Sequence, residues 1–221
     1  MSSRGLGLLF LAGALCAVGC ASTRDQEVKR LQARALYEQG LGHLENQRIA
    51  LGLSSVQEAV RLDPSSALYR NTLGVLFLHY LARPVDAQRE FEKALEIDPA
   101  YAEAQGNLGV ALAQQGRWSE AVSAYRKALS MPVYPTPELA YANLGWAYVN
   151  LKRPKEAEEA YRAAIQLQPK FAQAFYFLGV VLEQEGRRIE ARDALRSARD
   201  LDPDSAFGKR AAELLKALPE Q

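Results

Sequence analysis

Five glycines recur along the chain at a nearly constant interval of about 35 residues, and this recurrence constrains the fold more than any other feature. Each glycine is followed further along by a second small residue, then by a larger side chain and an alanine. A fixed period of this length is typical of a solenoid, in which one supersecondary unit repeats and packs on its neighbours. The four sets are Gly40, Gly74, Gly109, Gly145 and Gly179; Gly52, Ala87, Ala121, Ala157 and Ala191; Val56, Phe91, Tyr125, Tyr161 and Leu195; and Ala59, Ala94, Ala128, Ala164 and Ala198.

The repeated unit is clearest at residues 139–169. Leu144 and Tyr148 are one helical turn apart, so they fall on one face of a predicted first helix. The small residues Gly145 and Ala157 would let this helix and a second, antiparallel one approach closely. The unit resembles the tetratricopeptide repeat (TPR), a helix–turn–helix of about 34 residues. A proline that ends the second helix occurs in four units, at Pro64, Pro99, Pro169 and Pro203, and the third unit has Val133 there.

This resemblance implies an all-α fold, a right-handed superhelical solenoid of about five TPR repeats with a C-terminal capping helix. Leucines of the segment after the fifth repeat would cover that repeat, while its charged residues face water. Three prolines within residues 131–137 predict an extended connection between the third and fourth repeats. The predicted repeats are 33–66, 67–101, 102–137, 138–171 and 172–205, and the capping helix with its tail is 206–221.

Residues 1–19 are predicted to be a lipoprotein signal peptide. Arg4 precedes an apolar stretch at residues 6–18, which is too short to span a bilayer but suits a secretory leader. The stretch ends in Ala-Val-Gly-Cys and resembles a bacterial lipobox, which implies lipidation of Cys20 and an outer-membrane location facing the periplasm. Cleavage nearby by the ordinary signal peptidase is the alternative. Residues 20–32 are predicted as a tether, in which Asp25 could start the first helix.

Composition and motifs predict no catalysis. The net charge of +1 gives no electrostatic reason to expect a nucleic acid or an anionic membrane surface as partner. The sequence contains no HExxH, CxxC, P-loop or GxSxG motif, and neither a cofactor nor a metal is expected. His43 and His79 lie in different repeats among apolar neighbours, which favours a packing or groove role for each over a role as a ligand.

Recognition of another protein is therefore the predicted chemistry. In the TPR fold, the first helix of each repeat lines a concave groove, chiefly at its fifth, ninth and twelfth positions. These positions are mostly apolar here, and this favours an amphipathic helix or an extended hydrophobic segment as the bound partner. The register also places Gly106, Ala113 and Glu183 in the groove. The predicted groove residues are Tyr37, Leu41, Leu44, Asn71, Val75, Leu78, Val110, Ala142, Trp146, Val149, Tyr176 and Val180.

A lipobox followed by a short TPR array resembles the pilotin-type lipoproteins of type IV pilus biogenesis, the PilF/PilW/Tgl family. The more specific likeness lies at Tyr134-Pro135 with residues 141–145, and in the first repeat at residues 37–44. The family is described with six repeats, whereas five are counted here. The resemblance implies binding to the outer-membrane secretin and assistance in its assembly. Two alternatives stay open: another periplasmic scaffold, for tight-adherence pili or β-barrel assembly, and a regulator of a cell-wall enzyme.

Overall fold

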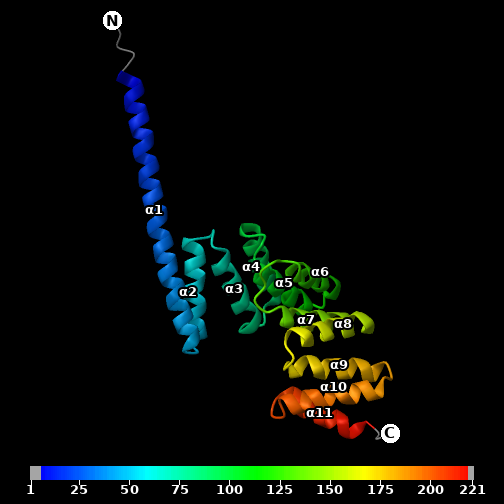
Figure 1. Cartoon of the computed structure of the whole chain (residues 1–221). Helices are drawn as coiled ribbons and strands as arrows, with labels where there is room; N and C mark the ends of the chain where they lie inside the picture. The colour runs from blue at the N-terminus through cyan, green and yellow to red at the C-terminus, as the bar shows by residue number, and fades with distance from the viewer. Residues whose placement is uncertain (1–5, 219–221) are drawn as a thin grey trace.

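The computed structural model describes residues 6–218, with side chains from residue 24 onward. Within this range the chain forms eleven α-helices and no strand (Figure 1). The result confirms the predicted all-α solenoid. The helices are α1 (Leu6–Glu45), α2 (Ile49–Leu62), α3 (Ala67–His79), α4 (Pro84–Ile97), α5 (Ala102–Gln114), α6 (Trp118–Leu129), α7 (Pro137–Asn150), α8 (Pro154–Leu167), α9 (Ala172–Gln184), α10 (Arg188–Leu201) and α11 (Ala206–Ala217).

The helices pack as successive antiparallel pairs, α1 with α2 through α9 with α10, and follow one another in a curved row (Figure 1). The first helices α3, α5 and α7 each touch the first helix of the next pair, and α9 touches α11 in the same way. Second helices do not meet to a comparable extent in the described part of the chain. First helices therefore line the inner side of the curve, called here the inner face, and second helices form the outer side.

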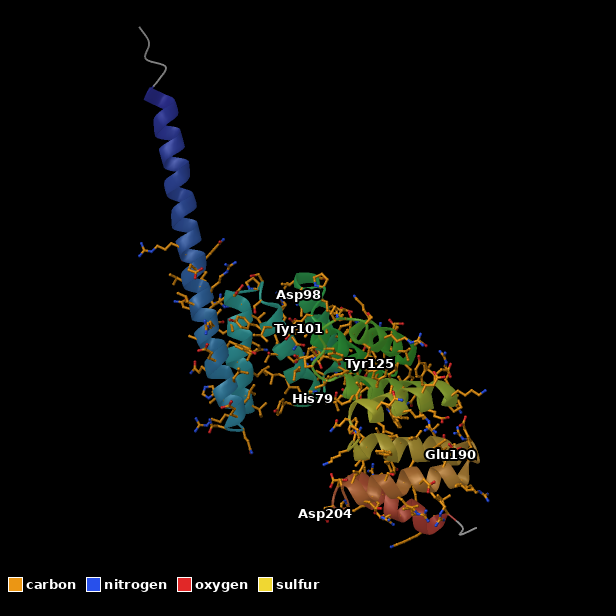
Figure 2. All side chains as sticks on the ribbon, viewed as in Figure 1. His79, Asp98, Tyr101, Tyr125, Glu190 and Asp204 are labelled. Atoms are coloured by element: carbon orange, nitrogen blue, oxygen red, sulfur yellow. The ribbon has the colours of Figure 1, made fainter. Side chains whose placement is uncertain are left out.

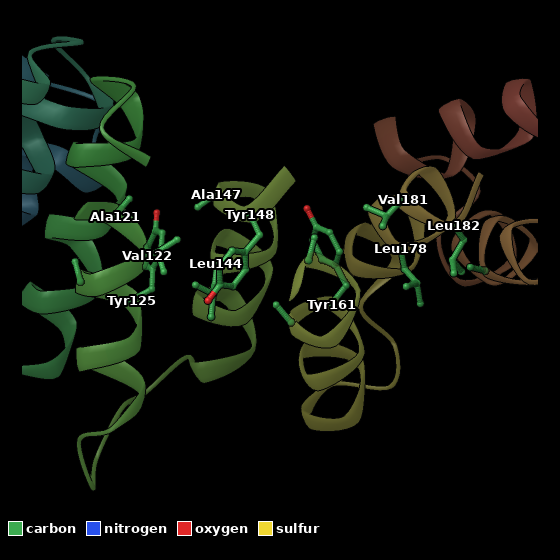
Figure 3. Close-up of a cluster of buried hydrophobic side chains, with 14 of the residues drawn as sticks. Ala121, Val122, Tyr125, Leu144, Ala147, Tyr148, Tyr161, Leu178, Val181 and Leu182 are labelled. Atoms are coloured by element: carbon green, nitrogen blue, oxygen red, sulfur yellow. The ribbon is translucent and has the colours of Figure 1, made fainter. Parts of the chain in front are cut away.

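The recurring glycines lie where paired helices come closest. A Cβ atom added to Gly145 would lie 2.7 Å from the ring of Tyr161, and one added to Gly109 would lie 2.5 Å from the ring of Tyr125. Each ring thus occupies the space left by a glycine on the facing helix. Figure 3 shows these tyrosines among the buried side chains that join the third, fourth and fifth repeats. The spacing of the glycines in the sequence therefore records a packing rule.

Polar clamps join some repeats but not others. Arg117 donates to Gln88 of the preceding repeat at 2.8 Å, and Arg187 donates to Glu158 in the same way at 2.5 Å. Val122 stands at the equivalent position of the third repeat and offers no acceptor. Among the described side chains, no hydrogen bond or ion pair joins α6 to α7 or α8, although Arg126 lies over the ring of Tyr148. The third and fourth repeats are thus held by apolar packing and this cation–π contact, and a cavity of about 500 Å³ lies between α6, α7 and α8.

Helix α1 is one continuous helix from Leu6 to Glu45, and only its C-terminal part pairs with α2 (Figure 1). Asp25 lies inside this helix, so the prediction that it starts the helix is wrong. Residues 1–5 and 219–221, which belong to the predicted signal peptide and tail, and the side chain of Cys20 lie outside what the structure describes. None of the described helices combines the length and the hydrophobicity that crossing a bilayer would require.

Helix α11 closes the end of the array. Leu214, Leu215 and Leu218 pack against the buried Leu195 and Ala198 of the fifth repeat, as the sequence predicted. Its charged residues Lys209, Arg210, Glu213 and Lys216 are exposed. Because α11 contacts both α9 and α10, it occupies the place that the first helix of a sixth repeat would take.

Candidate protein-binding face

The inner face carries most of the predicted groove residues. Leu41 and Trp146 are exposed there, and Trp146 keeps 44% of its surface accessible. Seven others are half-buried and so combine packing with some exposure: Tyr37, Leu44, Val75, Val110, Val149, Tyr176 and Val180. Together these side chains form a largely uncharged surface, as the register indicated. Their role in binding stays a prediction.

Three of the predicted groove residues are buried and belong to the interior instead: Asn71, Leu78 and Ala142. Two of them, Asn71 and Ala142, share the fifth position of their repeats, and an aromatic residue from the end of the same repeat covers each. Tyr101 accepts a hydrogen bond from Asn71 at 3.2 Å, and Phe171 packs against the cluster that contains Ala142. The register describes which residues share a helix face, but it could not show that the following link folds back over the fifth position.

The third repeat follows the same rule through the proline-rich connection. The hydroxyl of Tyr134 lies 2.1 Å from the position that a Cβ atom of Gly106 would take. Gly106 is therefore covered by the link and contributes no accessible surface. Burial raises the pKa of the Tyr134 hydroxyl above the ordinary value of a tyrosine. The segment around Tyr134 thus packs on its own repeat in addition to connecting two repeats.

Leu78 is buried for a different reason. It lies against Ala87 and Phe91 of α4 and Ala111 of α5, in the core between the second and third repeats. In the first repeat, Leu44 occupies the corresponding position and packs against Gly52. A Cβ atom added to Gly52 would lie 2.6 Å from the side chain of Leu44. The twelfth position therefore contributes to the contact between helices in both repeats.

An aromatic patch on the inner face joins α7, α9 and α11. We define it as Trp146, Tyr176, Phe177 and Phe207. The ring of Phe177 lies at its centre, with centroids 5.4 Å from Trp146, 5.1 Å from Tyr176 and 5.5 Å from Phe207. Phe177 also stacks on the buried Tyr161 at 5.8 Å, which fixes the patch to the core.

Two of the four patch residues, Trp146 and Tyr176, lie at predicted groove positions. Phe177 occupies the sixth position of its repeat, outside the three positions considered, and Phe207 belongs to the capping helix. Two adjacent aromatic residues at 176–177, followed by a third at the start of the cap, were the available signal. Their meeting depends on α11 docking beside α9, which the repeat register alone does not describe.

The side chains on and directly beneath the inner face differ in chemistry between its two ends. Toward the N-terminus, Asn71 donates to Glu103 at 3.2 Å and accepts from Asn107 at 3.0 Å, and Tyr37 shares a hydrogen bond with Thr72. Toward the C-terminus, the aromatic patch replaces such a network. A side chain that binds there would gain mainly from apolar and aromatic contact.

No cluster of side chains suited to metal binding emerges in residues 24–218. No three His, Cys, Asp or Glu side chains in this range lie close enough together to hold a metal ion. His43 is half-buried on α1, and His79 is exposed at the end of α3.

Comparison with known proteins identifies the repeat family and finds a relative that is described as a type IV pilus assembly protein. The pattern of the family described as "Tetratricopeptide repeat" matches residues 80–135 and 142–206. The type IV pilus assembly protein PilF of Pseudomonas aeruginosa is 33% identical over 134 residues, which are 58% of this chain and 52% of PilF. The small glutamine-rich tetratricopeptide repeat-containing protein 2 of Saccharomyces cerevisiae is 30% identical over 108 residues, or 48% of this chain and 31% of the yeast protein.

Solved structures extend the similarity over most of the chain. The structure of P. aeruginosa PilF superposes with a TM-score of 0.73 at 25% identity and covers 85% of this chain and 86% of PilF. That of PilW, described as a widely conserved type IV pilus biogenesis factor, gives a TM-score of 0.74 at 24% identity and covers 83% and 86%. PilW at this identity supports the fold alone. The sequence match spans about half of PilF and a third of the yeast protein.

Proposed function

We propose that this chain, which belongs to the tetratricopeptide-repeat family, is a protein-binding assembly factor of type IV pilus biogenesis. In this proposal it is anchored in the outer membrane and acts on the pilus secretin. Repeats of this family present an extended curved surface to other proteins. The similarity to PilF, described as a type IV pilus assembly protein, supports the assignment to pilus assembly.

The observation that carries this proposal is the aromatic patch around Trp146. Soluble proteins seldom expose contiguous apolar surface without a partner for it, and buried aromatic anchors dominate many interfaces. The patch has no charged member, so its partner should offer apolar side chains in place of a terminal carboxylate or a basic motif. An amphipathic helix or an extended hydrophobic segment of a secretin subunit meets this requirement.

Attachment to the membrane rests on Cys20. A cysteine carrying several acyl chains gives a stable anchor, whereas a single chain binds reversibly. We expect Cys20→Ala to release the protein from membranes or to leave the uncleaved precursor. Metabolic labelling with palmitate followed by membrane fractionation measures this. Palmitate label that persists in Cys20→Ala would contradict lipidation at this residue.

Site-specific photocrosslinking tests the partner. A benzophenone amino acid at Val180, beside the aromatic patch, should crosslink to a secretin subunit in cells that assemble pili. The control position is Ile189, which is 72% exposed on the outer helix α10 and should give no such adduct. Equal adducts from both positions, or an adduct from Val180 to a different envelope protein, would overturn the assignment to the secretin.

A further inference from the structure

Helix α1 carries an apolar stripe on the side that faces away from the repeats. Val28 is 45% exposed, Leu31 is 59% exposed and Ala35 is also exposed. Ala33 and Gly40 are buried on the packed side of the same helix. At about 100° per residue, the stripe lies roughly 140–160° around the helix from Ala33. Figure 2 shows side chains projecting from this free side of α1.

Nothing else in the described chain covers this stripe. Helix α2 packs against α1 only along its C-terminal part, and α1 runs on beyond the end of α2 (Figure 1). Singly exposed apolar residues are common on surfaces, but a row at spacings of three and four residues on one helix is the pattern of a helix-pairing seam.

The charges beside the stripe are self-complementary. Arg24 and Glu38 lie at equal distances before and after Leu31, and Glu27 and Arg34 lie on one flank of it. If two copies of α1 run antiparallel with Leu31 opposite Leu31, each Arg24 meets the partner's Glu38. Each Glu27 then meets the partner's Arg34, so no like charges face each other along this flank.

The existing ion pairs leave these groups free to exchange partners. Arg34 pairs with Glu38 of its own helix at 2.9 Å, and both side chains are more than half exposed. Exposed pairs of this kind contribute little to stability, so opening them costs little. A lipid surface suits the stripe less well, because the carboxylates of Glu27 and Glu38 beside it would be pressed into the headgroups without a partner.

We propose that residues 24–38 of α1 pair antiparallel with the same segment of a second copy of this chain, about a two-fold axis at Leu31. A two-fold contact requires a self-complementary surface, and the stripe with its flanking charges meets that requirement. The seam is short, so the pair is weak in dilute solution. The pair forms where copies of the chain are concentrated on one membrane surface. This high local concentration is the one part of the inference that rests on the proposed lipid anchor.

Disulfide crosslinking of the full chain in its own membranes tests the pairing. A residue on a two-fold axis lies opposite itself, so Leu31→Cys should form covalent dimers on mild oxidation. Gln26→Cys is the matched control, because Gln26 is exposed on the same stretch of helix but points away from the stripe. The unsubstituted chain gives the background, which should be low because the proposed processing removes Cys16 and attaches lipid to Cys20. Dimer from Leu31→Cys that does not exceed that from Gln26→Cys would overturn the proposal.

Charge exchange provides the second measurement. In the Leu31→Cys background, Arg24→Glu should lower the dimer yield about fivefold by setting like charges opposite each other. Adding Glu38→Arg should restore the yield, since the pair is then reversed but intact. Loss without rescue would exclude the antiparallel register.

A maleimide reagent distinguishes the other possible occupants of the stripe. Protection of the introduced thiol of Leu31→Cys from maleimide without any dimer would show that lipid or another protein covers the stripe, and would also overturn the proposal. Secretin crosslinking from Val180 is unaffected by the charge variants, so the pairing and the proposed function fail separately.

Discussion

Gly208→Ala should displace α11 from the end of the array and melt the fifth repeat early. A Cβ atom on Gly208 would lie 1.9 Å from the carbonyl oxygen of Asp202 and 3.0 Å from the Cα atom of Pro203. These are backbone atoms, which cannot rotate away as a side chain would. Ser205 caps α11 by accepting from the Gly208 amide at 3.0 Å, so the helix start is held at the point of the clash. We expect a loss of about 2–3 kcal/mol, which is typical of overpacking.

Hydrogen exchange of amides in α9, α10 and α11 measures this effect. Because a solenoid repeat depends on its neighbours, exchange should accelerate at the C-terminal end and stay unchanged in the second repeat. Deleting the chain from Ala206 onward should produce the same local pattern with lower solubility. Gly42→Ala is the matched control, since nothing lies within 4 Å of its Cβ position, and it should stabilise α1 by about 0.5–1 kcal/mol. Unchanged hydrogen exchange in the fifth repeat after Gly208→Ala, or after the deletion from Ala206 onward, would contradict the capping role of α11.

Trp146→Ala should leave the fold nearly intact and weaken partner binding by about 2 kcal/mol or more, roughly a thirtyfold rise in Kd. The side chain is 44% exposed, and its principal ring contact is with Phe177 on the neighbouring helix. Truncating a fully buried tryptophan would instead cost about 3–5 kcal/mol of stability. Thermal melting and secretin multimer formation, measured on the same variant, therefore separate a binding residue from a core residue.

Two controls define the outcome for Trp146. Ile189→Ala removes another exposed apolar side chain, from outer helix α10, and should change neither melting nor binding. Tyr161→Ala removes a buried ring of the core and should lower the melting temperature strongly. Collapse of melting in Trp146→Ala would place this residue with Tyr161 in the core. Normal melting with normal secretin assembly would show that the inner face is not where a secretin binds.

The repeat register was readable from the sequence because packing leaves little choice at its positions. Position 145 must be small because position 161 is large: the ring of Tyr161 fills the space that a Cβ atom on Gly145 would take. The same pairing of a glycine with an aromatic or leucine side chain occurs in four of the repeats. It therefore appears in the sequence at a regular interval. Leu214 and Leu215 of the cap were likewise readable, because a solenoid end must be covered on one face and wetted on the other.

The composition of the inner face was only partly readable. The ninth position was predicted correctly as accessible for Trp146. The predicted accessibility of the fifth position was wrong for Asn71 and Ala142, because Tyr101 and Phe171 fold back over them from the links. Link residues have no helical period, so their direction follows from where the next helix docks.

By itself, the sequence determined the helical pairs, their order and the capping of the last repeat, because helix periodicity and glycine–aromatic complementarity are local rules that each repeat obeys separately. Only the tertiary structure decided which surface the chain offers to others. The contact of Trp146 with Phe177 and of Phe177 with Phe207 crosses three helices, and the side of α1 at Leu31 is free because α2 packs on the opposite side of that helix. Both depend on how neighbouring units dock, and no single repeat contains that information.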